Sequence, residues 1–121
     1  MMELAAEIRK TGQYTVDETP WGSLTWFASK QMGNARHLTV GQCKILPGKH
    51  NPRHHHPNCE EVLHVLQGRI KHSYGDESAE MNAGDTITVP AGIPHNAVNI
   101  GDGEAIMMIT FSSSERLTIG E

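Results

Sequence analysis

The 121-residue chain carries 10 Lys and Arg residues against 14 Asp and Glu residues, for a formal net charge of -4. A chain of this length forms one domain, so we expect a single domain over residues 1–121. Its acidic balance argues against a nucleic-acid partner, and no apolar run approaches the ~20 residues that span a bilayer.

The cysteine content and the first residues indicate the cellular compartment of the protein. Cys43 and Cys59 are too few for a disulfide framework. The opening residues, MMELAAEIRK, lack the apolar segment of a signal peptide. We therefore expect a cytoplasmic protein with free thiols and no membrane partner.

The first residues carry a weak helical signal. Leu4, Ala5 and Ile8 form an apolar stripe at helical spacing, and Gly12 can end a helix. A helix this short is marginal unless it docks on another element. The pattern predicts a short N-terminal helix or arm over residues 1–12.

After Gly12 the helical period disappears, and short apolar or alternating runs follow between Gly, Pro and Asp turns. Strands are expected at residues 24–28, 38–46, 62–67, 69–74, 86–89, 96–100 and 105–111. Strands of this length and spacing are typical of an all-β sandwich or barrel. No crossover helices are present, which excludes a parallel α/β fold.

Histidine is concentrated in one segment. Four of the eight histidines lie within seven residues, at His50, His54, His55 and His56. On a strand, His54 and His56 share one face and His55 points to the other. The acidic residue Glu61 follows, and His95 comes after a Pro-rich turn. Three imidazoles and a carboxylate suit one divalent transition metal, namely Fe, Mn, Ni, Zn, Co or Cu.

Two segments around these residues have fixed spacing. Residues 48–68, GKHNPRHHHPNCEEVLHVLQG, fit G-x5-H-x-H-x4-E-x6-G, and residues 84–99, GDTITVPAGIPHNAVN, fit G-x5-P-x-G-x2-H-x3-N. Both closely resemble the two signature motifs of the cupin superfamily. The 15 residues between them are similar to the spacer of small single-domain bacterial cupins.

The resemblance implies a double-stranded β-helix, the jelly-roll cupin barrel, with a core over residues 38–111 that contains both motifs. It also implies that four side chains converge on one metal ion, and these are His54, His56, Glu61 and His95. A homodimer is implied as well, because pairing would cover sheet edges that a small barrel leaves exposed. Asn99 is expected to form hydrogen bonds at a turn or a sheet edge and not to bind metal.

Several neighbouring residues leave alternatives open. Glu60 competes with Glu61, but the seven-residue step to Gly68 favours Glu61. That choice places Leu63 on the metal-side face and His64 on the opposite face. His72 lines the cavity only if Ile70 and Tyr74 also point inward, which the sequence does not decide. Arg53, next to the histidines, is a candidate partner for an anionic substrate.

These observations favour a metal-dependent enzyme that acts on a small polar molecule such as a sugar or a carboxylate. The chemistry would be that of a dioxygenase, or of an isomerase or lyase. Candidates for the general base are His72, Tyr74, Glu60 and a metal-bound hydroxide. The alternative is a cupin that binds a small ligand without turning it over.

Overall fold

Strands make up nearly all of the regular structure in the computed structural model, which describes residues 3–121. They are β1 (Thr15–Thr19), β2 (Gly22–Ala28), β3 (Thr39–Ile45), β4 (His54–His55), β5 (Glu61–Gln67), β6 (Arg69–Tyr74), β7 (Glu77–Asn82), β8 (Thr86–Val89), β9 (Ala97–Asn99), β10 (Ala105–Phe111) and β11 (Ile119–Gly120). The strand pairs are antiparallel. Their arrangement confirms the predicted all-β jelly-roll barrel.

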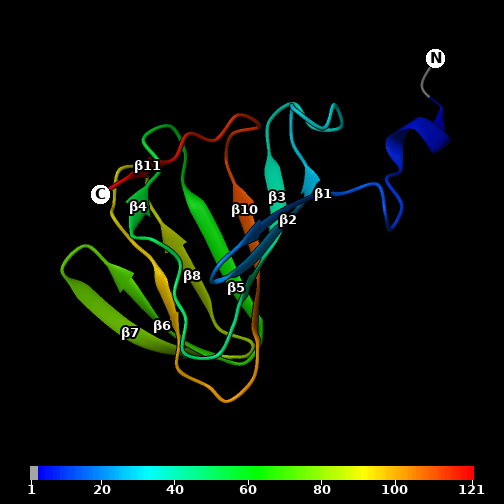
Figure 1. Ribbon diagram of the computed structural model, residues 1–121. Coiled ribbons are helices and arrows are strands. Elements are labelled where there is room, and N and C mark those ends of the chain that lie inside the picture. The colour runs from blue at the N-terminus through cyan, green and yellow to red at the C-terminus, as the bar shows by residue number, and fades with distance from the viewer. Residues whose placement is uncertain (1–2) are drawn as a thin grey trace.

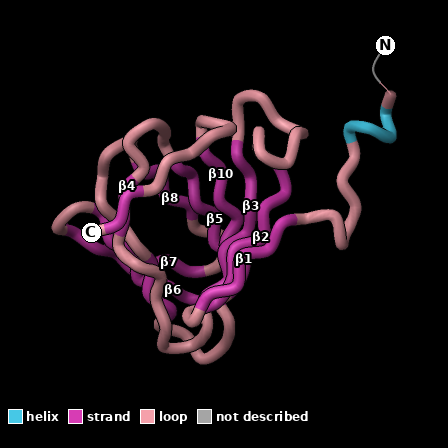
Figure 2. The backbone as a smooth tube through the Cα atoms, turned by 45° about the horizontal axis from the view of Figure 1, so that its top comes forward, coloured by secondary structure: helices cyan, strands magenta, loops and turns pink. Residues whose placement is uncertain are grey.

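Two sheets form the walls of the barrel, and a short third sheet adds to one end. The larger wall has the strand order β1-β2-β3-β10-β5-β8, and the smaller wall has the order β7-β6-β9. A two-stranded ribbon pairs β11 with β4. Figures 1 and 2 show the larger sheet on one side of the interior, β6 and β7 on the other, and β4 near the C-terminus.

Alternation of side chains along the central strands builds the core. In β3 and β10 every second residue is buried, in register across the pair. Cys43, Ile45, Met107 and Phe111 thereby share the inner face, where they are no more than 4% exposed. Burying this apolar face supplies the main driving force for closing the barrel.

The N-terminal helix exists but is shorter than the expected arm over residues 1–12. It is a single 3-10 turn, η1 (Leu4–Glu7), and it ends well before Gly12. Leu4 is 78% exposed and Ile8 47% exposed, so the apolar stripe is not buried against any of residues 3–121. Figure 1 shows the turn standing away from the barrel, which explains why no longer helix forms. No helix among residues 3–121 has the length and hydropathy of a transmembrane span.

The sequence missed three strands outside the His-rich segment. β1 (TVDET) is an edge strand without a fully buried residue, and β7 (ESAEMN) buries only Met81. Neither has the apolar alternation that reveals a half-buried strand. The third, β11, consists of two exposed residues that pair with β4. Strand pairing therefore extends beyond the 38–111 core on both sides.

A glycine on β3 makes room for the largest core side chain. A Cβ atom on Gly41 would lie 2.5 Å from Cε3 of Trp26 and 2.8 Å from the carbonyl oxygen of Thr25. Trp26 is 7% exposed and packs at a 6.1 Å centroid distance from Phe111. The indole ring therefore occupies the space that any other residue at position 41 would need.

We expect Gly41→Ala to lower the free energy of unfolding by about 1–3 kcal/mol, because the added methyl group overpacks the core beneath Trp26. Gly103→Ala is the matched control, since no atom lies within 4 Å of its Cβ position. The control should change the free energy by less than about 0.5 kcal/mol. Urea unfolding followed by circular dichroism measures both variants, and equal stability of the two would contradict the packing account.

Candidate metal centre

Backbone hydrogen bonds join the two motifs. The amide of His54 donates to the carbonyl oxygen of His95 at 3.0 Å, and the amide of His95 donates to the carbonyl oxygen of His54 at 2.8 Å. The turn before His95 is fixed as well, because Gly92 (φ +83°) donates its amide to the carbonyl oxygen of His56 at 2.9 Å. Only glycine adopts this φ without strain. Residues some forty positions apart are thus held side by side.

The acidic member comes from a different strand. Glu61 is the first residue of β5 and pairs with Val89 of β8 and Phe111 of β10. Its inward orientation gives it an exposed fraction of 5%. The neighbouring Glu60 is exposed, so the spacing-based choice of Glu61 for the inward carboxylate agrees with the structure.

The structure brings together all four predicted residues. The available ligand atoms of His54, His56, Glu61 and His95 lie within 4.8 Å of one another. Three of the side chains are buried, and His54 is half-buried. Such a spacing is what one small cation needs to contact all four atoms.

Carbonyl oxygens of the backbone fix the orientation of the three rings. The partners of the Nδ1 atoms are the carbonyl oxygens of Pro52 for His54 (2.7 Å), of Leu117 for His56 (2.8 Å) and of Ile93 for His95 (2.8 Å). Because a carbonyl only accepts, each Nδ1 carries the proton and donates it. In the neutral rings the lone pair is therefore on Nε2, the atom that faces the centre of the group.

This donor set fits a metal ion. The Nε2 atom of His56 is buried without a hydrogen-bond partner, although it lies 3.3 Å from Oε1 of Glu61. The Nε2 atom of His95 lies 3.0 Å from the same oxygen. Lone pairs on two nitrogens and on a carboxylate repel one another at this range unless a positive charge lies between them. The arrangement provides a site for one divalent transition metal per chain.

Without a metal, a proton takes part of that role. Burial raises the pKa of Glu61, but hydrogen bonds and charge from His56 and His95 outweigh it and lower the pKa to about 2. Burial lowers the pKa of His95, and the adjacent Glu61 reverses the shift, so the pKa is raised. The pKa of His54 is lowered to about 4, chiefly by burial. A metal ion must therefore compete with a proton held between His95 and Glu61.

The four residues open into a cavity of about 350 Å³. Its wall is largely apolar and includes Trp26, Leu63, Met107, Ile109 and Phe111. The volume lies at the lower end of the range for small-molecule sites.

For some of the other histidines, strand alternation correctly predicts the orientation of the side chain. For His72, only the folded structure shows the orientation. His64 is on the opposite face of β5 from Leu63 and contacts Oγ1 of Thr86 through Nδ1 at 2.6 Å. His55 is half-buried and His50 is exposed, and neither joins the four-residue group. His72 is 2% exposed and lines the cavity. Its side chain therefore points inward, which the sequence had left undecided.

His72 stacks near His95, with 5.7 Å between ring centroids and an interplanar angle of 12°. Of the protein side chains considered as general bases, His72 lines the cavity and Tyr74 and Glu60 do not. Asn99 forms the expected turn hydrogen bonds, donating to the carbonyl oxygens of Ile45 and Gly103.

Sequence reasoning missed the contribution of the segment after β10. Leu117 supplies the carbonyl that orients His56, and Thr118 and Arg116 line the cavity. This stretch has neither strand periodicity nor a motif, so the sequence contains no signal for its position. Arg53, the expected anion partner, instead pairs with Glu121 at 3.0 Å.

We expect the metal-loaded protein to hold about one equivalent of divalent transition metal, and His56→Ala and His95→Ala each to lose most of it. His55→Ala is the matched control, because its side chain lies outside the group. Equilibrium dialysis followed by elemental analysis gives the stoichiometry. Full retention of metal in both ligand variants would contradict the assignment.

We expect metal affinity to rise with pH until the raised pKa of His95 is passed, and then to level off. Below that pKa each bound ion displaces one proton, so affinity should change about tenfold per pH unit. Chelator competition between about pH 5.5 and 8.5 follows this dependence around the ordinary histidine range. A constant affinity over the whole range would show that no proton competes with the metal.

Comparison with known proteins places these features in a family. Residues 41–111, more than half of the chain, match the family model described as Cupin domain. Germin-like protein 3-8 of Oryza sativa subsp. japonica is 31% identical over 85 residues, which cover 66% of this chain and 38% of that protein. Oxalate oxidase 1 of Hordeum vulgare is 30% identical over 88 residues, covering 66% of this chain and 44% of that protein.

The fold is shared with a solved enzyme structure. The Lactobacillus farciminis oxalate decarboxylase formate complex superposes with a TM-score of 0.83 at 24% identity, covering 90% of this chain and 34% of that chain. The chain thus spans less than half the length of each of these three relatives. The match over both motifs and the shared barrel show that the chain belongs to the Cupin domain family.

Proposed function

We propose that this protein is a metal-dependent cupin enzyme that acts on a small organic acid. The observation that carries the proposal is the group of His54, His56, Glu61 and His95, which opens into a cavity of about 350 Å³. A purely structural metal site is closed, whereas a catalytic site leaves a coordination position accessible. Here the accessible space lies inside the barrel, next to the group.

The metal, when bound, would supply Lewis-acid or redox chemistry to a substrate that coordinates it. Three imidazoles and one carboxylate leave one or two positions free on a five- or six-coordinate ion. The backbone carbonyls that hold the rings keep the four donors in position before the substrate arrives. The apolar wall excludes water and strengthens electrostatic interactions inside the cavity.

His72 is the side chain placed to transfer a proton in this cavity. Burial lowers its pKa, so the imidazole is neutral near pH 7 and can accept a proton. Nδ1 is buried without a hydrogen-bond partner. The ring stacks beside His95, with 5.7 Å between the two centroids.

A carboxylate substrate is favoured over a sugar for two reasons. The relatives compared above include an oxalate oxidase and an oxalate decarboxylase, both named for a small carboxylic acid. The largely apolar wall offers few groups that could bind several sugar hydroxyls at once. Both considerations support an organic acid as the substrate class.

The homodimer and the cytoplasmic location stay predictions. The free edge of β1 supports pairing between two copies of the chain, because this exposed strand lies at the edge of the six-stranded sheet.

The test is consumption of organic acids by the metal-loaded protein. We expect at least one acid from a panel of mono- and dicarboxylates to be consumed over many turnovers, as followed by mass spectrometry. His95→Ala, which should lack metal, is the control for contaminating activity. Consumption in air but not under argon would indicate oxidation by dioxygen, and equal consumption would indicate lyase or isomerase chemistry. Binding of acids without any conversion would contradict the proposal and indicate a binding cupin.

A further inference from the structure

A cation from outside the two motifs lines the cavity. Arg116 follows β10, and its guanidinium carbon lies 4.2 Å from the ring centroid of Trp26 and 5.2 Å from that of Phe111. Arg116 and Trp26 also line the neighbouring surface groove, so they form part of the wall between the two spaces. Stacking on two aromatic rings restricts where the planar guanidinium can go.

Among residues 3–121, Arg116 forms no ion pair with a carboxylate. The Lys and Arg residues that form ion pairs among residues 3–121 are Lys30, Lys44, Arg53 and Arg69. Arg116 donates to Oγ1 of Thr118 at 2.5 Å, which satisfies one of its five N–H groups. Burial lowers the pKa of Arg116, and the negative charge of Glu61 opposes that shift. The guanidinium nevertheless remains charged at neutral pH.

A half-buried charge without a counter-ion is unfavourable unless a ligand supplies one. Arg53 illustrates the contrast, since Glu121 accepts from it at 3.0 Å and the carbonyl oxygen of Gly75 at 2.6 Å. Arg53 thus has a carboxylate and a carbonyl partner, whereas Arg116 lines the cavity and, among residues 3–121, hydrogen-bonds only to the hydroxyl group of Thr118. An anionic group in the cavity would complete its hydrogen bonding.

His56 and Arg116 both contact the ring of Phe111. Its centroid lies 4.9 Å from that of His56 and 5.2 Å from the guanidinium carbon of Arg116. One ligand could therefore coordinate a metal beside His56 and also reach Arg116, provided that its two ends are separated. A second acidic group several bonds away from the coordinating end meets this requirement.

We propose that Arg116 is a specificity-determining residue, which binds a distal carboxylate of the substrate while the other end of the substrate coordinates the metal. The inference rests on the proposed function and narrows its substrate class to diacids with separated acidic groups. A planar guanidinium can form two parallel hydrogen bonds with a carboxylate, which a lysine cannot reproduce.

The test compares two ligands that differ only at the distal end. A five-carbon 2-oxo diacid, 2-oxoglutarate, and its 5-methyl ester share the 2-oxo acid group that can chelate a metal. Dissociation constants are measured by calorimetry on metal-loaded protein, and quenching of tryptophan fluorescence provides a second readout near Trp26. Wild type should bind the diacid roughly 10- to 100-fold more tightly than the ester, the range expected for a charged hydrogen bond.

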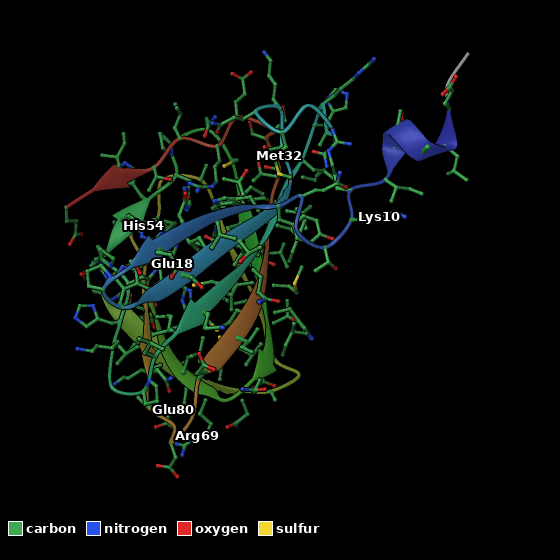
Figure 3. All side chains as sticks on the ribbon, turned by 45° about the vertical axis from the view of Figure 1, so that its right-hand side comes forward. Lys10, Glu18, Met32, His54, Arg69 and Glu80 are labelled. Atoms are coloured by element: carbon green, nitrogen blue, oxygen red, sulfur yellow. The ribbon has the colours of Figure 1, made fainter. Side chains whose placement is uncertain are left out.

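Arg116→Gln should abolish that preference and change binding of the ester by less than about twofold. Arg116→Lys should keep part of the preference. Arg69→Gln is the matched control, because Arg69 pairs with Glu80 at the surface, far from His54 in Figure 3. This variant should prefer the diacid to the same extent as wild type. Metal content and melting temperature of each variant confirm that the site is intact.

Three results would overturn the inference. They are an unchanged preference in Arg116→Gln, an equal loss for both ligands, and wild-type protein that binds the two ligands equally or not at all. None of these contradicts the proposed function by itself, because consumption of any other acid in the panel would still support it. Absence of consumption across the panel, with the charge preference intact, would instead contradict the proposed function alone.

Discussion

The buried carboxylate of Glu61, facing the Nε2 atoms of His56 and His95, is the interaction on which the site depends. Each ring is turned into this position by a backbone carbonyl that accepts from Nδ1. The result is a group of acceptor atoms that repel one another unless a cation lies between them. In this sense the binding of a metal, or of a proton in its place, is determined by how the backbone orients the rings.

Backbone hydrogen bonds of the barrel hold the metal-binding side chains in place, in addition to contacts among those side chains. His54 and His95 form a reciprocal pair of amide–carbonyl bonds, and the amide of Gly92 is bonded to His56. The positions of the ring-bearing backbone are therefore fixed before any ion binds. Such preorganisation avoids the entropic cost of collecting four donors from a flexible chain.

The segment after β10 gives the site features that the two motifs lack. Leu117 orients one ring, and Arg116 adds a positive charge to a cavity that is otherwise largely apolar. Its position depends on Trp26, which in turn occupies the space left by Gly41. A glycine on a central strand thus affects which groups face the cavity, through two layers of packing.

Strand alternation and motif spacing, which are local properties of the chain, indicated an all-β fold and the inward choice of Glu61. The jelly-roll barrel and the convergence of the four metal-binding candidates were implied by the resemblance of the two motifs to those of cupins. The sequence also indicated a helix near Leu4, which is only one turn because its apolar stripe is not buried against any of residues 3–121. Only the tertiary structure decided that His72 faces the cavity, that Arg53 is paired with Glu121, and that Arg116 forms no ion pair among residues 3–121. Polar strands such as β7, which buries only one residue, could not be predicted from the sequence either. The physical reason is that these features depend on residues far apart in the sequence. Local patterns do not show which distant residues come together in the fold.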